Sequence, residues 1–201
     1  MLGRDDWMKK RMIWVLSIIC IAVGLLGCSS QKVECYSYDV KEVKSIEIET
    51  GAASIILLKH TGVNIEVSYT KKVAEIREGT MKINIPMPGG VIHLKKPSDL
   101  IVKVPEALYE NIQIKSESGN ISISGIEAKI LNAETLYGNI SIEPLSGEIE
   151  TLAEVGDIKT ELPISTQIEY LDPVGQKLNS RIGDSENKIK LYSETGTIEL
   201  R

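Results

Sequence analysis

Between Asn111 and Arg201, apolar and polar residues alternate in short runs that are interrupted by a glycine at nearly constant intervals. Successive glycines lie 19, 18, 19 and 21 residues apart, and they are Gly119, Gly138, Gly156, Gly175 and Gly196. Alternation with period two predicts strands with one buried face, and a repeat of about 20 residues is typical of a solenoid. We therefore predict an all-β fold, a parallel β-solenoid (β-helix-like) with two short strands in each coil of about 18 to 21 residues.

The same offset from each glycine holds the same kind of residue. Seven positions before it, the copies have Ile112, Leu131, Ile149, Ile168 and Ile189. Two positions after it, four copies have Ile121, Ile140, Ile158 and Ile198. The intervening offsets are mostly polar, so the apolar rows are expected to face the core. The copy at Gly175 has Lys177 where the others have isoleucine, and we expect a loop or bulge between Gly175 and Gly183.

The glycines are interpreted as structural turns that join the two strands of a coil. We assign this role to Gly119, Gly138, Gly156 and Gly196, because glycine adopts positive φ without a clash at Cβ. Asn120, Asn139 and Asp157 follow three of them, and these side chains tolerate the same conformation. A second bend is expected near Gly125, near Pro144 to Gly147 and near Pro163, since proline does not continue a central strand.

From Val40 to Pro105 the strands continue with less regular spacing. We interpret this part as the first coils, with hairpin-like excursions that cap the N-terminal end of the solenoid. The segment from Lys71 to Glu78 fits a short helix and a strand equally well. At the other end, the rung that contains Leu200 is expected to be an exposed edge.

The first 27 residues have the pattern of an export signal. Lys9, Lys10 and Arg11 precede an apolar run that is shorter than the roughly 20 residues of a membrane span. The run ends in Leu25-Leu26-Gly27-Cys28, which resembles the lipobox of bacterial lipoproteins. That resemblance implies signal cleavage between Gly27 and Cys28 and acylation of the Cys28 thiol by palmitate-type chains.

The predicted domain organisation is a lipoprotein signal peptide at 1–27, a lipidated cysteine and tether at 28–39, and a solenoid at 40–201. Two or more acyl chains would hold such a protein stably at the cell membrane. An uncleaved membrane anchor is the alternative, and both interpretations place the solenoid outside the cytoplasm. Met8 is an alternative start to Met1, because Met8-Lys9-Lys10-Arg11 is the more ordinary beginning of a signal.

The charge of the chain limits its binding partners, and its cysteine content limits its disulfide bonds. The chain has 23 basic and 28 acidic residues, and removal of the signal leaves 19 and 26, a net charge of −7. This balance argues against nucleic acid and against adsorption to anionic lipid. With Cys20 in the signal and Cys28 lipidated, Cys35 is the remaining thiol, so no intramolecular disulfide is expected. An unreactive thiol or an intermolecular disulfide both fit Cys35.

The sequence predicts no cofactor, no metal and no catalytic residue. Neither His60 nor His93 has cysteine or histidine at metal-ligand spacing, and both are interpreted as strand residues. The Gly-Asn and Gly-Asp pairs lack the denser phrase of calcium-binding repeats, so stacked turn residues explain them better. Outward carboxylates are scattered over several coils, and they are Glu134, Glu143, Glu150, Asp157 and Glu161. A polysaccharide-acting β-helix enzyme, which needs such groups clustered in a groove, stays a minor alternative.

Several segments together resemble the bacterial putative-adhesin family, a domain-of-unknown-function family of envelope β-solenoids. They are Leu100–Pro105, Ile112–Ser116, Ser118–Ile123 and Ser193–Leu200, and the resemblance covers about Val40 to Arg201. Membrane-anchored members include the LiaG-like proteins encoded near envelope-stress sensing systems. The resemblance implies an envelope protein and supplies no catalytic residues.

We therefore expect an extracytoplasmic protein, lipid-anchored to the cell membrane, with a non-catalytic, adhesin-like binding module. Its expected partners are the membrane, through the anchor, and a protein or a cell-wall or surface polymer. An accessory protein of envelope-stress sensing that docks on a membrane partner is the alternative. A purely structural spacer also fits the repeat.

Overall fold

The computed structural model describes residues 32–87, 98–143, 146–161 and 168–201. The chain divides into two compact units, Met1–Lys32 and Val33–Arg201, and the strands described below all belong to the second. Within the described ranges, no helix has the length and apolar content needed to cross a membrane.

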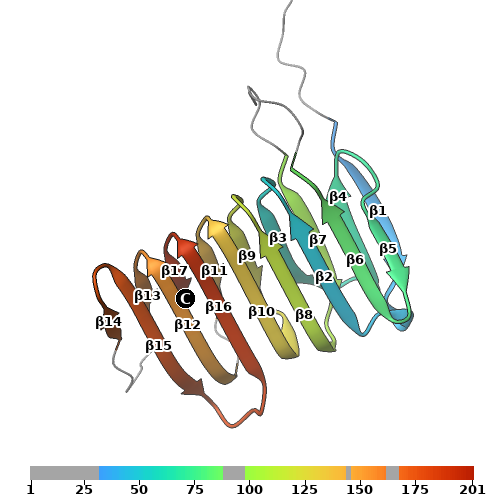
Figure 1. Ribbon diagram of the computed structural model, residues 1–201. Coiled ribbons are helices and arrows are strands. Elements are labelled where there is room, and N and C mark those ends of the chain that lie inside the picture. The colour runs from blue at the N-terminus through green and yellow to red at the C-terminus, as the bar shows by residue number, and fades with distance from the viewer. Residues whose placement is uncertain (1–31, 88–97, 144–145, 162–167) are drawn as a thin grey trace, which may run out of the picture. The chain divides into compact units, whose positions relative to one another are not determined.

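The second unit consists of two β-sheets. Sheet A has the spatial order β1(Glu34–Asp39), β4(Asn64–Tyr69), β7(Leu100–Pro105), β3(Ile55–His60), β9(Ile121–Ser124), β11(Ile140–Ile142), β17(Ile198–Leu200) and β13(Ile158–Thr160). Sheet B has the order β14(Glu169–Leu171), β15(Gly175–Ile182), β12(Gly147–Val155), β16(Lys188–Thr195), β10(Glu127–Tyr137), β8(Leu108–Ser116), β2(Ser45–Thr50), β6(Thr80–Ile85) and β5(Ala74–Arg77). A short 3-10 helix, η1(Val40–Glu42), joins β1 to β2. Figure 1 shows the strands side by side, from β14 and β13 at one end to β5 and β1 at the other.

Each coil is one strand of sheet B followed by one strand of sheet A, and neighbouring coils pair in parallel. In space the coils follow the order β6–β7, β2–β3, β8–β9, β10–β11, β16–β17 and β12–β13. The predicted parallel β-solenoid is therefore confirmed, but spatial and chain order differ at both ends. The last coil lies between β10–β11 and β12–β13, so Leu200 is in register with Ile142 and Thr160. The expectation that its rung is an exposed edge was wrong, because β13 covers it.

The core is the space between the two sheets, and it is filled by the predicted apolar rows. Buried residues include Ile112, Leu131, Ile149 and Ile189 from sheet B and Ile121, Ile140, Ile158 and Ile198 from sheet A. Register places Ile140 between Ile121 and Ile198, one strand spacing of about 4.8 Å from each. Each such side chain contributes roughly 1.5–3 kcal/mol through burial, and only stacked neighbours complete that burial.

The copy around Gly175 is not a coil. Residues 175–182 form β15, which pairs antiparallel with β12 on one side and with β14 on the other. The predicted loop or bulge was therefore wrong. Lys177 lies opposite Leu152 in the outward row, whereas Leu178 lies opposite Thr151 and is buried. In β15, the residues that face the core lie one position away from those that the repeat predicts. The lysine that stands at the isoleucine position of the repeat therefore faces outward. β14 and β15 thereby end sheet B beyond β12.

At the N-terminal end, antiparallel strands cap the solenoid as predicted. β1 pairs with β4, and β4 with β7, while β5 pairs with β6 at the same end of sheet B. The segment Lys71–Glu78, left open between helix and strand, contains the strand β5. The Tyr38 hydroxyl donates to the Ala74 carbonyl oxygen at 3.2 Å and so links β1 to β5 across the core. Residues 34–39, assigned to the tether from sequence, are part of sheet A, and Cys35 is exposed on β1.

Buried hydroxyls line the bend of four coils. Thr50, Ser116, Thr135 and Ser193 are buried just before the turns of four coils. The Thr135 hydroxyl donates to the Gly119 carbonyl oxygen at 3.2 Å, and the Ser193 hydroxyl donates to that of Gly138 at 3.0 Å. These bonds satisfy backbone acceptors that the stacked coils shield from water.

A matched pair of threonines tests the contribution of this hydroxyl ladder. Thr135→Val removes the donor to the buried Gly119 carbonyl, and it should lower the free energy of unfolding by about 1–3 kcal/mol. Thr151 is also buried, but its hydroxyl has no hydrogen-bond partner. Thr151→Val should therefore leave stability unchanged or raise it. Urea unfolding of both variants makes the comparison, and equal losses would contradict the assigned role of Thr135.

Candidate binding face

The four turn glycines form a column at one corner of the solenoid, but positive φ explains only two of them. Gly156 and Gly196 have φ of 152° and 153°. Gly119 and Gly138 do not have positive φ, and there a Cβ would meet the backbone of the neighbouring coil, at the carbonyls of Ala53 and Gly119 respectively. The predicted reason was thus wrong at these two positions, where close approach between coils requires glycine. The predicted cleavage and lipidation site at Gly27 and Cys28 lies outside the residues that the structure describes.

The polar residues that follow the glycines stack on one another. The backbone N–H of Asn139 donates to Asn120 Oδ1 at 2.9 Å, and the backbone N–H of Thr197 donates to Asn139 Oδ1 at 2.8 Å. At the end of the column, Asp157 Oδ1 accepts a hydrogen bond from Gln176 Nε2 at 3.3 Å. These side chains act as stacked turn residues, as the sequence suggested.

The residues considered for metal or acid–base chemistry do not gather into one cluster in the described part of the chain. No group of three or more metal-ligating side chains occurs in the ranges that the structure describes. His60 Nε2 lies 2.8 Å from the Asn64 carbonyl oxygen, while His93 falls outside the described ranges. Of the scattered carboxylates, Glu134 on β10 and Glu150 on β12 share the outer face of sheet B. The other three follow or precede short strands of sheet A, and they are Glu143, Asp157 and Glu161.

Sheet B presents its outward side chains in rows that cross β8, β10, β16, β12 and β15, and we call this surface the outer face of sheet B. One row follows the register Gln113, Asn132, Lys190, Glu150 and Asn179. The next row follows Lys115, Glu134, Tyr192, Leu152 and Lys177. Because the strands are paired on both sides, the rows are held at fixed spacing.

Ion pairs cross neighbouring strands of this face. Lys190 Nζ lies 2.8 Å from Glu150 Oε2, and Lys115 Nζ lies 3.6 Å from Glu134 Oε2. The hydrogen bond from Lys190 lowers the pKa of Glu150, and the same bond raises the pKa of Lys190. The pairs are largely exposed, so each contributes little to stability, but they fix where charge lies on the face.

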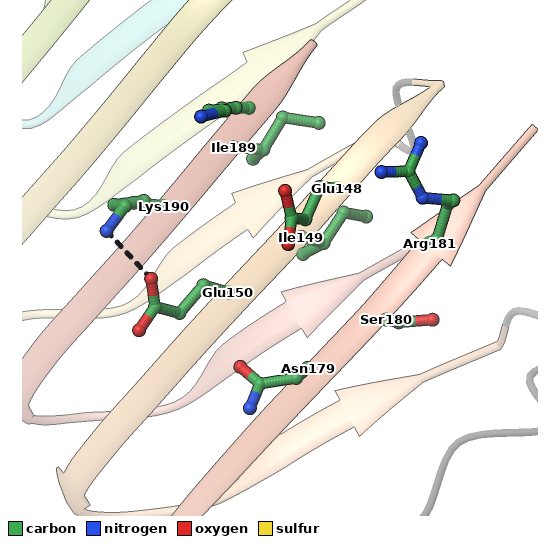
Figure 2. A pocket seen from close by; sticks show the side chains of 9 residues that line it. Glu148, Ile149, Glu150, Asn179, Ser180, Arg181, Ile189 and Lys190 are labelled. Carbon is green, nitrogen blue, oxygen red and sulfur yellow. Dashed lines mark ion pairs between the residues drawn. The ribbon is translucent and has the colours of Figure 1, made fainter. Parts of the chain in front are cut away.

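Two adjoining hollows lie on the outer face. The first, of about 690 Å³, lies over β12, β15 and β16, and Figure 2 shows its side chains with the Lys190–Glu150 pair. In that hollow Glu148 is in register with Lys188 on one side and Arg181 on the other. The second, of about 340 Å³, lies around Tyr192 and Leu152 and is also lined by both ion pairs.

Tyr192 is the aromatic side chain in the second hollow, and sequence reasoning did not single it out. Burial raises its pKa to about 12, and a hydrogen bond with Glu154 adds to the effect, so the phenol stays protonated at neutral pH. The repeat itself indicates this position, because the side chain four residues before each turn glycine faces outward. That offset holds Lys115, Glu134, Leu152 and Tyr192 in the four regular copies.

Comparison with known proteins places the chain in a family. A family model described as Toastrack DUF4097 matches residues 43–201. The chain belongs to the Toastrack family. No curated protein matches it.

Two solved structures resemble this Toastrack chain at 14% sequence identity. A putative cell adhesion protein from Clostridium sporogenes aligns with a TM-score of 0.52, over 84% of this chain and 98% of that one. A putative adhesin from Bacteroides fragilis aligns with a TM-score of 0.27, over 86% of this chain and 98% of that one. The first likeness shows that the solenoid architecture occurs in a protein described as adhesive, and the family match agrees with the predicted adhesin-like domain of unknown function.

Proposed function

We propose that this protein is a lipid-anchored component of the cell envelope whose Toastrack domain is a non-catalytic, adhesin-like binding module. The outer face of sheet B is its binding surface. The observation that carries the proposal is the pair of adjoining hollows on a continuous, rigid set of strands, with charge fixed by two ion pairs. A face of this kind contacts an extended polymer or a protein over several strands.

The state of the carboxylates supports binding rather than hydrolysis. A glycosidase needs two carboxyl groups that flank one bond, one of them with a raised pKa. Glu134 and Glu150 are each paired with a lysine, and the pKa of Glu150 is lowered. Both groups therefore serve as fixed hydrogen-bond acceptors.

Anchoring and location rest on the N-terminal sequence and on the family. Leu25-Leu26-Gly27-Cys28 provides the acylation site, and the solenoid begins within a few residues of it, at β1. Cys28 would tie the solenoid to the outer surface of the cell membrane, and the fold shared with a putative cell adhesion protein supports a surface location.

The proposal is tested by separating anchoring from binding in the full chain. Wild type should partition with lipid membranes and should also bind delipidated envelope polymer from the source cells. Cys28→Ser should lose lipid partitioning, appearing either in the medium or as unprocessed precursor, and should keep its binding to the polymer. Sedimentation with each fraction, followed by quantification of the pellet, measures both properties.

The possible results distinguish the alternatives. Failure of both forms to sediment with delipidated polymer would contradict the binding role. Recovery of a membrane sensor protein with wild type, without polymer binding, would favour the envelope-stress role instead. Release of reducing sugar from the polymer would favour the minor enzymatic alternative.

A further inference from the structure

We infer that the hollow around Tyr192 and Leu152 is a glycan site that takes an uncharged pyranose segment of a polysaccharide. This inference rests on the proposed function and names the class of ligand for one part of the outer face of sheet B. It concerns the smaller hollow and not the neighbouring one at Arg181.

An aromatic–aliphatic strip lines the hollow. Tyr192 on β16 is directly in register with Leu152 on β12, so the two side chains are cross-strand neighbours on one face. Both are half-buried, which restricts their rotamers before a ligand arrives. The C–H face of a pyranose ring packs against such a surface, because it matches the electron-rich face of an aromatic ring. The volume of about 340 Å³ lies within the range of ordinary small-ligand sites.

The rim of the hollow supplies fixed donors and acceptors. Lys115–Glu134 continues the row of the strip onto β10 and β8, and Lys190–Glu150 lies in the neighbouring row, which Gln113 and Asn132 continue toward β8. A sugar hydroxyl both donates and accepts, and it can therefore bond to a carboxylate and a lysine of the same ion pair.

Charge decides between an uncharged and a charged polymer. The two lysines and two glutamates at the rim compensate one another within the hollow. An anionic polymer would have to separate Lys190 from Glu150 and would then lie beside the released carboxylate. An uncharged, hydroxyl-rich ligand bonds to both partners without that cost, so the charge pattern is complementary to a neutral glycan.

The test uses the full chain in detergent and uncharged linear tetrasaccharides of glucose, N-acetylglucosamine, mannose, galactose and xylose. At least one should bind in isothermal titration and should compete with delipidated envelope polymer. Tyr192→Ala should weaken that binding about tenfold through loss of the stacking surface, whereas Tyr192→Phe should stay within about twofold of wild type. Tyr137→Ala is the control, because Tyr137 is 59% exposed and does not line this hollow.

Circular dichroism of each variant excludes an effect through folding. Equal binding by wild type and Tyr192→Ala would overturn the inference, as would the absence of binding by all five tetrasaccharides. If wild type still sediments with envelope polymer in either case, the proposed binding role stands and only the glycan site fails. If wild type binds neither the tetrasaccharides nor the envelope polymer, the proposed function is overturned as well.

Discussion

Ile140→Asp is expected to abolish the folded solenoid or to leave it only marginally stable. Ile140 is 0% exposed and lies in register between Ile121 and Ile198, in the middle of the stacked row. A carboxylate there has no cation to pair with, and burying it costs several kcal/mol, against a total stability of about 5–15 kcal/mol for a domain of this kind. Thermal unfolding followed by circular dichroism measures the loss.

Ser122→Asp is the matched control for this substitution. Ser122 is exposed on β9, in the row next to the buried one, and lies opposite Ser141. The same new charge is hydrated there, so the melting temperature should stay close to that of wild type. A melting curve of Ile140→Asp that matches wild type would show that the inward register of the repeat is wrong.

Gly196→Ala is expected to be the most damaging single methyl addition in the C-terminal coil. Gly196 has a φ of 153°, and a Cβ there would meet the carbonyl group of Gly138 on the next coil. The backbone carbonyl cannot turn away like a side chain, so the coils must separate at this corner. We expect a loss of about 2–5 kcal/mol in the free energy of unfolding, measured by urea titration.

Gly62→Ala provides the comparison for this glycine. The three atoms nearest to a Cβ at position 62 belong to the ring of His60, whose hydrogen bonds to Asn64 and Gly62 are exposed, so water can replace them when the ring moves aside. A loss below about 1 kcal/mol is therefore expected. Similar losses for the two variants would contradict the close stacking of the corner at Gly138 and Gly196.

The inward rows could be predicted because strand geometry alone sets them. Successive side chains of a strand alternate between its two faces, so Ile112 and Ile114 both face inward whatever lies next to them. The order of the coils has no comparable signal. Every coil offers the same parallel edge above and below, and β16 pairs equally well with β10 and β12 because their offsets match.

The strand β15 illustrates a second limit. Its reversal relative to β12 places Leu178 inward and Lys177 outward, although the count from Gly175 predicts the opposite for Lys177. The direction of β15 is decided by the segment that connects it to β12 and by its pairing with β14, and both are tertiary features. The role of Gly119 was likewise misjudged, since the distance between adjacent backbones is not visible in a single repeat.

The binding face was partly present in the sequence. Glu134 and Glu150 were recognised as outward carboxylates, and their lysine partners follow only from the lateral register of β8, β10, β16 and β12. Tyr192 and Leu152 occupy the same outward offset in two copies that are consecutive in space. The two residues are neighbours because β16 lies between β12 and β10, and the sequence gives no sign of that position.

Lysine footprinting of the full chain, with and without delipidated envelope polymer, tests the central claim most directly. Lys115 and Lys190 line the hollow around Tyr192, whereas Lys159 lies on β13 of the opposite sheet. If the outer face of sheet B is the binding surface, bound polymer should protect Lys115 and Lys190 from acetylation and leave Lys159 as reactive as before. Protection of Lys159 with unchanged reactivity at Lys115 and Lys190 would contradict the account.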